Sequence, residues 1–319
     1  MPTPAATCML PLNSKHFQGQ ELIRVGDDSS FMLLAPQFGA RLVRWVHRGE
    51  DILYWPQNAD WSQLARVRGG NPILFPFIAR HFVDSVPGAW KDASGTVRTL
   101  PIHGFARDLP FAGTRHEAGR SLTMTLQASD ATRAAYPFEF LFEVTYRLLD
   151  DGLEATLRTR NAGEQALPYY AGHHFYFPLA HQARAASTLT MPAAELMRQR
   201  PDGSLASNGQ GAETYQLDDP RLQDTFHVLH AQPAAPRHCT LATPPDATAP
   251  HGRKLVIDLD TPGSTPWFAV TTWSERVDSD FYCVEPWLGL PNAIHHGTGL
   301  RWLAPGQEEA AVCRLRVAP

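Results

Sequence analysis

Two adjacent histidines stand in an aromatic run, "GHHFYF" at residues 172–177. Imidazole gives or takes a proton near neutral pH, because its ordinary pKa is about 6.5. In a strand, successive side chains point to opposite faces, so His174 would share a face with Gly172 and Tyr176, while His173 faces the other way. The spacing favours His174 as a pocket residue and His173 as a packed ring, although ordinary core or surface imidazoles remain the alternative.

Three further stretches carry side chains suited to binding and proton transfer. His103 precedes Arg107 in "HGFAR", and Arg80 ends the stretch "GGNPILFPFIAR". Glu285 lies two residues before Trp287 in "VEPW", and a tryptophan face is suited to stacking on a sugar ring. Each signal is weak when taken alone.

The elements that must position these residues are mostly short strands. In "FEFLFEVTYRLL", residues 138–149, apolar side chains alternate with polar ones, as expected of a strand with one buried face. The same period of two recurs in residues 121–127, 153–161 and 254–260, with turn residues such as "DDG" and "NAG" between the runs. Only residues 60–68 and 193–200 carry helix signals. The pattern predicts an all-β fold built from antiparallel sheets.

Length and charge exclude several classes of protein. A chain of 319 residues with 43% hydrophobic and 19% charged residues can bury a large core, and a chain of this size can still be a single all-β domain. The net charge is −4 and no run of Lys or Arg occurs, so we expect no nucleic-acid partner.

Cysteine use and the N-terminal sequence bear on the cellular location. Cys8, Cys239, Cys283 and Cys313 are widely spaced and form no C-x-x-C pair, which predicts reduced thiols rather than a zinc site or a disulfide framework. No signal-peptide pattern and no membrane-length apolar segment is visible, so the expected location is the cytoplasm, with no membrane partner.

Taken together, these stretches resemble successive blocks of the aldose 1-epimerase (galactose mutarotase-like) family. The matching blocks are "GARLVRWVHRGEDILY", "GGNPILFPFIAR", "LPIHGFARDLPF", "YPFEFLFEVTYRL", "LPYYAGHHFYFPL", "CVEPWLGLPNA" and "GLRWLAPGQ", which extend from about residue 38 to about residue 306. The resemblance implies one large antiparallel β-sandwich of the supersandwich type over residues 1–319, with a shallow cleft on one sheet.

The resemblance also implies roles for single residues. The family's G-x-H-x-Y-F element selects His174, the histidine that strand parity assigns to the open face. His103 matches the family's other histidine, Arg80 its sugar-binding arginine and Glu285 its catalytic carboxylate, while Asp224 in "LQDTF" is the best match for a substrate-binding acid.

Mutarotation interconverts the α and β anomers of an aldose by opening the ring, which needs one acid and one base. We expect His174 to protonate the ring oxygen and Glu285, kept ionised by an arginine such as Arg80, to take the proton of the anomeric hydroxyl. Trp287 would supply an apolar platform for the sugar. No metal or cofactor is required.

The substrate and the class of activity have alternatives. The sequence lacks the Asn-rich segment that precedes the second histidine of galactose mutarotases. The block "HGFARDLPF" is similar to the corresponding block of hexose-6-phosphate mutarotases. With such a substrate, Arg107 or Arg80 of this chain would hold the phosphate. "VEPWLGLPNA" instead favours a free aldose, which is the preferred interpretation. A non-catalytic carbohydrate-binding protein and a glycoside hydrolase are the rivals; the latter needs two facing carboxylates. Whether the protein is a monomer or a homodimer stays open.

Overall fold

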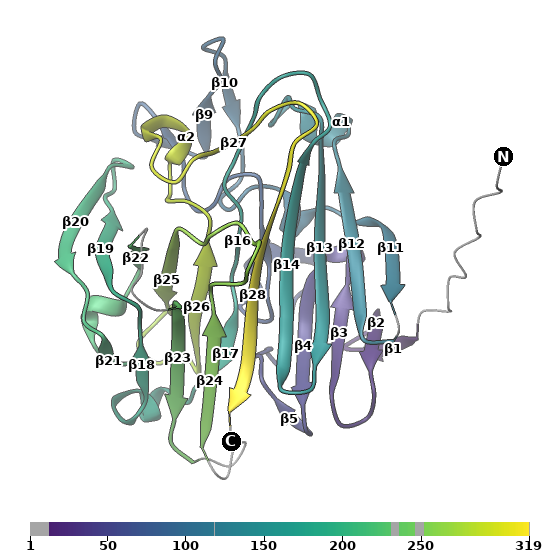
Figure 1. Cartoon of the computed structure of the whole chain (residues 1–319), viewed down its shortest axis with the longest axis vertical. Coiled ribbons are helices and arrows are strands. Elements are labelled where there is room, and N and C mark those ends of the chain that lie inside the picture. Colours follow the sequence, from purple (N-terminus) through teal and green to yellow (C-terminus); the bar gives the residue numbers. More distant parts are fainter. Residues whose placement is uncertain (1–12, 118, 231–235, 246–251, 319) are drawn as a thin grey trace.

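The computed structural model describes residues 13–117, 119–230, 236–245 and 252–318, and Figure 1 shows the path of the chain. Cys8 and residues 1–12 of the N-terminal segment considered for a signal peptide lie outside these residues. Among the described residues, no helix has the length and apolar character needed to cross a membrane. The three described cysteines, Cys239, Cys283 and Cys313, are buried free thiols.

Three sheets and three short strand pairs make up the fold. The nine-stranded sheet has the order β11 (Ala112–Glu117), β12 (Ser121–Gln127), β13 (Phe140–Leu149), β14 (Gly152–Asn161), β28 (Glu308–Ala318), β24 (Arg253–Asp258), β23 (His238–Thr243), β18 (Thr188–Thr190) and β21 (Thr214–Gln216). The eight-stranded sheet has the order β20 (Leu205–Gln210), β19 (Ala194–Gln199), β22 (Thr225–Leu229), β25 (Ala269–Trp273), β26 (Phe281–Trp287), β16 (Gly172–His173) and β6 (Ile73–Leu74), with β17 (Tyr176–Pro178) also paired to β26. The five-stranded sheet contains β1 (Ser14–Phe17), β2 (Gln20–Gly26), β3 (Phe31–Ala35), β4 (Arg41–His47) and β5 (Glu50–Asp51).

The remaining elements are short. The strand pairs are β7 (Phe82–Val83) with β8 (Val86–Pro87), β9 (Ala89–Lys91) with β10 (Val97–Thr99), and β15 (Leu167–Tyr169) with β27 (Arg301–Leu303). The α-helices are α1 (Asp130–Arg133) and α2 (Ala293–His296), and the 3₁₀ turns are η1 (Pro36–Phe38), η2 (Trp61–Arg66), η3 (Ala106–Asp108), η4 (His181–Ala186) and η5 (Pro220–Leu222). The predicted all-β class with antiparallel sheets is confirmed.

The core lies between the sheets because alternate side chains of the long strands turn inward. Along β13, the buried side chains are Phe140, Phe142, Val144, Tyr146 and Leu148, as the sequence pattern predicts. Phe142 stacks on Phe75 with 4.1 Å between ring centroids, and Asn71 Nδ2 donates a 2.8 Å hydrogen bond to the Tyr146 hydroxyl. Phe75 and Asn71 flank β6, so these contacts join the nine-stranded sheet to the eight-stranded one.

One expected helix is wrong. Residues 193–200, read as helical from their composition, contain the strand β19, which pairs with β20 on one side and β22 on the other. Ala194 and Leu196 are 3% and 2% exposed, whereas Glu195 between them is only partly buried. Burial of alternate residues and two strand neighbours outweigh the helix propensity of Ala, Glu, Leu and Met. The other expected helix forms the 3₁₀ turn η2.

Candidate active site

The floor of the candidate site is set by strand register in the eight-stranded sheet. Phe226 of β22 pairs with Thr271 of β25, which pairs in turn with Glu285 of β26, so the three side chains lie on one face of the sheet. Two residues further along their strands, Trp273 and Trp287 emerge on the same face. Alternation along three strands therefore gathers a carboxyl group and two indoles at one place.

His174 is fixed between β16 and β17 by an amide from another segment. The Asn71 Oδ1 accepts a 2.7 Å hydrogen bond from the His174 backbone N–H, and Asn71 Nδ2 lies 2.9 Å from His173 Nδ1. The His174 ring stacks on Tyr176 at 4.7 Å with an interplanar angle of 3°. His173 is fully buried against Phe175, and burial lowers the pKa of His173 to about 3. The two histidines thus face opposite ways, as the strand spacing predicts.

His174 and Glu285 form a buried pair. His174 Nδ1 lies 3.3 Å from Glu285 Oε1, and the two side chains are 9% and 1% exposed. Burial raises the pKa of Glu285 well above its ordinary value; the Trp287 indole opposes this shift and Asp224 adds to it. Burial, followed by the positive charge of Arg107, lowers the pKa of His174 well below its ordinary value. The expectation that Arg80 keeps Glu285 ionised is wrong, because burial is the largest influence on this carboxyl group and raises its pKa.

His103 lies across from this pair on a strained loop. Its φ is 67°, a left-handed conformation uncommon for a residue other than glycine. Its Nδ1 accepts a 3.2 Å hydrogen bond from the Ala79 N–H, which leaves Nε2 to carry the proton of the neutral ring. The ring stands edge-on to His174 at 5.5 Å and to Trp287 at 6.2 Å. Burial, and then the charge of Arg107, lowers the pKa of His103.

All seven residues singled out from the sequence line one cavity of about 280 Å³: Arg80, His103, Arg107, His174, Asp224, Glu285 and Trp287. Arg80 and Asp224 are exposed, and Arg107 is partly buried with its Nε 3.9 Å from Asp108 Oδ2. Asp224 has a φ of 50°. The roles of these residues stay predictions, since their position shows only that they share a wall.

Sequence reasoning missed other residues of the wall, above all Arg66 and Arg68. Arg66 ends η2 and Arg68 lies two residues beyond it, and the buried guanidinium of Arg41 donates hydrogen bonds to the carbonyls of Leu64, Val67 and Gly69 in this segment at 2.6–3.2 Å. Arg41 thereby fixes a segment that turns two arginines to the cavity. The only signal in the sequence is the spacing "RVR", which puts both on one side of an extended chain.

Three side chains of the site have ligand atoms of types that bind metals. One atom each from His174, Cys283 and Glu285 lies within 4.8 Å of the other two. Burial raises the pKa of the Cys283 thiol well above its ordinary value, so the sulfur is held in its protonated form, which is a poor ligand.

Residues 21–316 match the family described as Aldose 1-epimerase, so the chain belongs to that family.

Relatives and solved structures agree with this assignment. A Salmonella typhimurium protein named "Putative glucose-6-phosphate 1-epimerase" is 33% identical over 114 residues, which is 34% of this chain and 34% of that protein. The chain thus matches about a third of the length of this curated relative. The structure of Slr1438 protein from Synechocystis is 26% identical, with a TM-score of 0.73 over 100% of this chain and 99% of that one. A galactose mutarotase-like protein from Clostridium acetobutylicum shares the fold, with 17% identity, a TM-score of 0.76 and coverage of 97% and 99%.

Proposed function

We propose that the protein is an aldose 1-epimerase that interconverts the α and β anomers of a hexose by general acid–base ring opening. The observation that carries this proposal is the His174–Glu285 pair, with 3.3 Å between Nδ1 and Oε1, in the wall of a cavity of about 280 Å³. That volume is slightly below the roughly 300–1,000 Å³ of ligand pockets and suits one sugar ring.

His174 donates a proton to the ring oxygen and Glu285 accepts the proton of the anomeric hydroxyl. The carbon–oxygen bond of the ring then breaks, and an open-chain aldehyde remains. Rotation about the bond to the carbonyl carbon, followed by the reverse proton transfers, closes the ring to the other anomer. Trp287 and the edge of His103 provide the walls against which the ring lies.

The mechanism needs one transferable proton on the His174–Glu285 pair, and burial determines which of the two side chains carries it. Because the pKa of Glu285 is raised and that of His174 is lowered, the empty cavity favours protonated Glu285 beside neutral His174. The reactive ion pair has the same total charge and forms when the proton crosses the contact of 3.3 Å. Hydrogen bonds from the sugar hydroxyls to the carboxylate would stabilise this form.

The cavity wall favours a phosphorylated hexose as substrate over the free sugar preferred from sequence. Four arginines line it, Arg66, Arg68, Arg80 and Arg107, against the acids Asp224 and Glu285. Forked guanidinium groups bind phosphate strongly, and a single neutral sugar has no need of four. The names of the curated relatives, which refer to glucose 6-phosphate, point the same way.

Anomer exchange measured by NMR on glucose, galactose and glucose 6-phosphate tests the proposal. We expect exchange well above the spontaneous rate, fastest for glucose 6-phosphate. A protein that binds a sugar without accelerating exchange would be a carbohydrate-binding protein, and this result would refute the proposed activity. Equal rates for all three sugars would remove the reason to assign the arginines to a phosphate.

A further inference from the structure

Arg68 lies between two cavities. It lines the candidate active site and also a second cavity of about 540 Å³, whose wall includes Arg66, Arg276, Asp278 and Phe281. The side chain of Arg68 is 37% exposed, so packing alone leaves it room to move. The direction in which its guanidinium points therefore depends on the groups that hold it.

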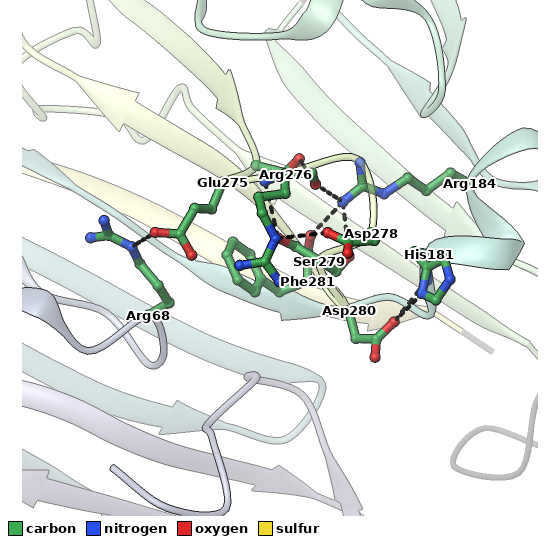
Figure 2. Close-up of polar contacts among 10 residues, drawn as sticks. Arg68, His181, Arg184, Glu275, Arg276, Asp278, Ser279, Asp280 and Phe281 are labelled. Atoms are coloured by element: carbon green, nitrogen blue, oxygen red, sulfur yellow. Dashed lines mark hydrogen bonds and ion pairs between the residues drawn. The ribbon is translucent and has the colours of Figure 1, made fainter. Parts of the chain in front are cut away.

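Two contacts hold Arg68 at the boundary between the cavities, one with Glu275, which lines the second cavity, and one with Trp273, which lines the active site. Arg68 Nε donates a 2.9 Å hydrogen bond to Glu275 Oε1, and the guanidinium lies over the Trp273 ring at 5.4 Å. The pKa of Arg68 is raised overall, because the lowering effect of burial is smaller than the combined raising effects of the Tyr176 hydroxyl and Glu275. In Figure 2 the Glu275 carboxylate meets Arg68 on its Nε side, and the terminal nitrogens point away from the loop that carries Glu275.

That loop, residues 274–280 between β25 and β26, is itself fixed. Arg184 is 7% exposed and its Nη2 donates to the carbonyls of Arg276, Ser279 and Phe281 at 3.2, 2.8 and 3.4 Å. Asp280 Oδ1 accepts a 3.0 Å hydrogen bond from the backbone N–H of His181. Figure 2 shows these anchors on the side of the loop opposite Arg68. The position of Glu275 is thus imposed by the loop and not by Arg68.

We propose that Glu275 is a positioning residue for substrate recognition: it holds Arg68 by Nε so that the terminal nitrogens face an anionic substituent of the sugar bound in the active-site cavity. This inference rests on the proposed function, because it assigns Arg68 to the phosphate of a hexose phosphate. Without Glu275, no acceptor fixes the Nε of Arg68, so its terminal nitrogens are free to turn toward the loop at residues 274–280 and the site loses a preorganised donor.

The test compares three variants of the full chain. Glu275→Ala removes the acceptor for Nε. Glu275→Gln keeps a side-chain oxygen that can accept from Nε. Asp278→Asn removes a charge from the same loop without touching Arg68, because Asp278 pairs with Arg276 at 2.8 Å. The measurements are KM and kcat for glucose 6-phosphate and for glucose, and the Kd of glucose 6-phosphate by calorimetry.

We expect Glu275→Ala to raise KM and Kd for glucose 6-phosphate about threefold to fivefold, the upper end for a partly exposed ion pair. Its kcat and its kinetics on glucose should stay within about twofold of wild type. Glu275→Gln and Asp278→Asn should keep wild-type affinity. An unchanged Kd in Glu275→Ala overturns the inference, and so does an equal loss in Glu275→Gln, which would make the charge and not the contact responsible.

Failure of the inference and failure of the proposed function give different results. If wild type does not bind glucose 6-phosphate but accelerates exchange of glucose, the inference is wrong and the activity stands. If glucose 6-phosphate binding depends on Glu275 but no sugar is epimerised, the activity is wrong and the positioning role stands. Thermal unfolding of each variant is measured first, and Glu275→Ser replaces Glu275→Ala if the latter unfolds early.

Discussion

Replacement of Glu285 by glutamine should separate folding from chemistry in this protein. Glu285 is 1% exposed, and glutamine has nearly the same shape, so the packing around β26 is retained. Because burial already favours the uncharged carboxyl group, a neutral amide costs little stability at this position. We therefore expect Glu285→Gln to unfold within a few degrees of the wild-type temperature and to bind its sugar.

The expected loss is in turnover. An amide cannot accept the proton of the anomeric hydroxyl, and His174 loses the carboxyl group that lies 3.3 Å from its Nδ1. One positioned acid or base contributes on the order of 10² to 10⁴ in rate, which corresponds to about 3–5 kcal/mol in activation free energy. We expect kcat for glucose 6-phosphate to fall by that factor while its Kd changes less than about threefold.

The assay is exchange between the anomeric protons, followed by NMR, with the spontaneous rate subtracted. Glu213→Gln, an exposed position, is the matched control and should keep full activity. A Glu285→Gln protein with near wild-type exchange would refute the assignment of the base and make Asp224, on the same cavity wall, the next carboxylate to replace.

The pH profile of the residual activity tests which partner is the acid. Wild type needs one proton on the pair, so its profile should be a bell. On the acid side, activity falls when the pair takes up a second proton, on His174. This fall should come at a pH below the ordinary pKa of histidine, because the pKa of His174 is lowered. On the alkaline side, it falls as Glu285 loses the last proton, above the ordinary pKa of a carboxyl group. In Glu285→Gln only His174 titrates, so if His174 is the acid the residual activity should fall as the pH rises through the lowered pKa of His174, with no fall on the acid side. The opposite pattern would make His174 the base.

The other predictions use residues around the same wall. His174→Asn should fold normally and lose about 10² to 10⁴ in kcat, whereas His173→Asn, at a fully buried ring, should lower the unfolding temperature more than turnover; the reverse pattern would contradict the two-sided placement of these rings. Arg107→Ala should raise KM for glucose 6-phosphate more than KM for glucose, whereas kcat changes for both sugars because Arg107 also lowers the pKa of His174; an equal rise in KM for both sugars would contradict a phosphate contact. Gly104→Ala should destabilise the fold by about 1–3 kcal/mol in urea unfolding, because φ is 75° and the new Cβ would lie 2.0 Å from the Phe75 carbonyl oxygen; an unchanged midpoint would contradict this.

Strands with one buried face could be predicted from sequence, and a strand with helix-forming residues could not. The alternation along β13 is complete, so its buried side chains follow directly from the period of two. In β19 the residues AELM are good helix formers, and what makes them a strand is pairing with β20 and β22, which come later in the chain. Such contacts are absent from any local window of sequence.

Of the candidate site, the residues in local sequence patterns could be predicted, and those that depend on distant contacts could not. His174 and Glu285 stand in recognisable blocks, and the strand parity of His174 could be read from its neighbours. Arg68 and Glu275 meet at 2.9 Å although 207 positions separate them, and each lies in a segment without strand alternation. Their contact depends on Arg41 and Arg184, whose guanidinium groups fix the two segments through backbone carbonyls. No pattern of residue types in the sequence shows to which backbone carbonyl a buried arginine will donate its hydrogen bonds.

The pKa values of Glu285 and His174 depend on how deeply each side chain is buried in the fold. A nearby arginine such as Arg80 led to the expectation of an ionised Glu285, since positive charge stabilises a carboxylate. Glu285 nevertheless lies deeper than the arginines at the cavity wall, with 1% exposure and Thr271 and Trp287 on its own face of the sheet, so loss of hydration outweighs their attraction and its pKa rises. The arginines act more clearly on His174, where Arg107, Arg41 and Arg68 disfavour the imidazolium. Both effects move the shared proton onto Glu285, and an incoming sugar that hydrogen-bonds to the carboxylate opposes them. In the proposed mechanism, ring opening would be coupled to binding, because the bound hydroxyl groups would help to create the charged acid and base that exchange protons with the sugar.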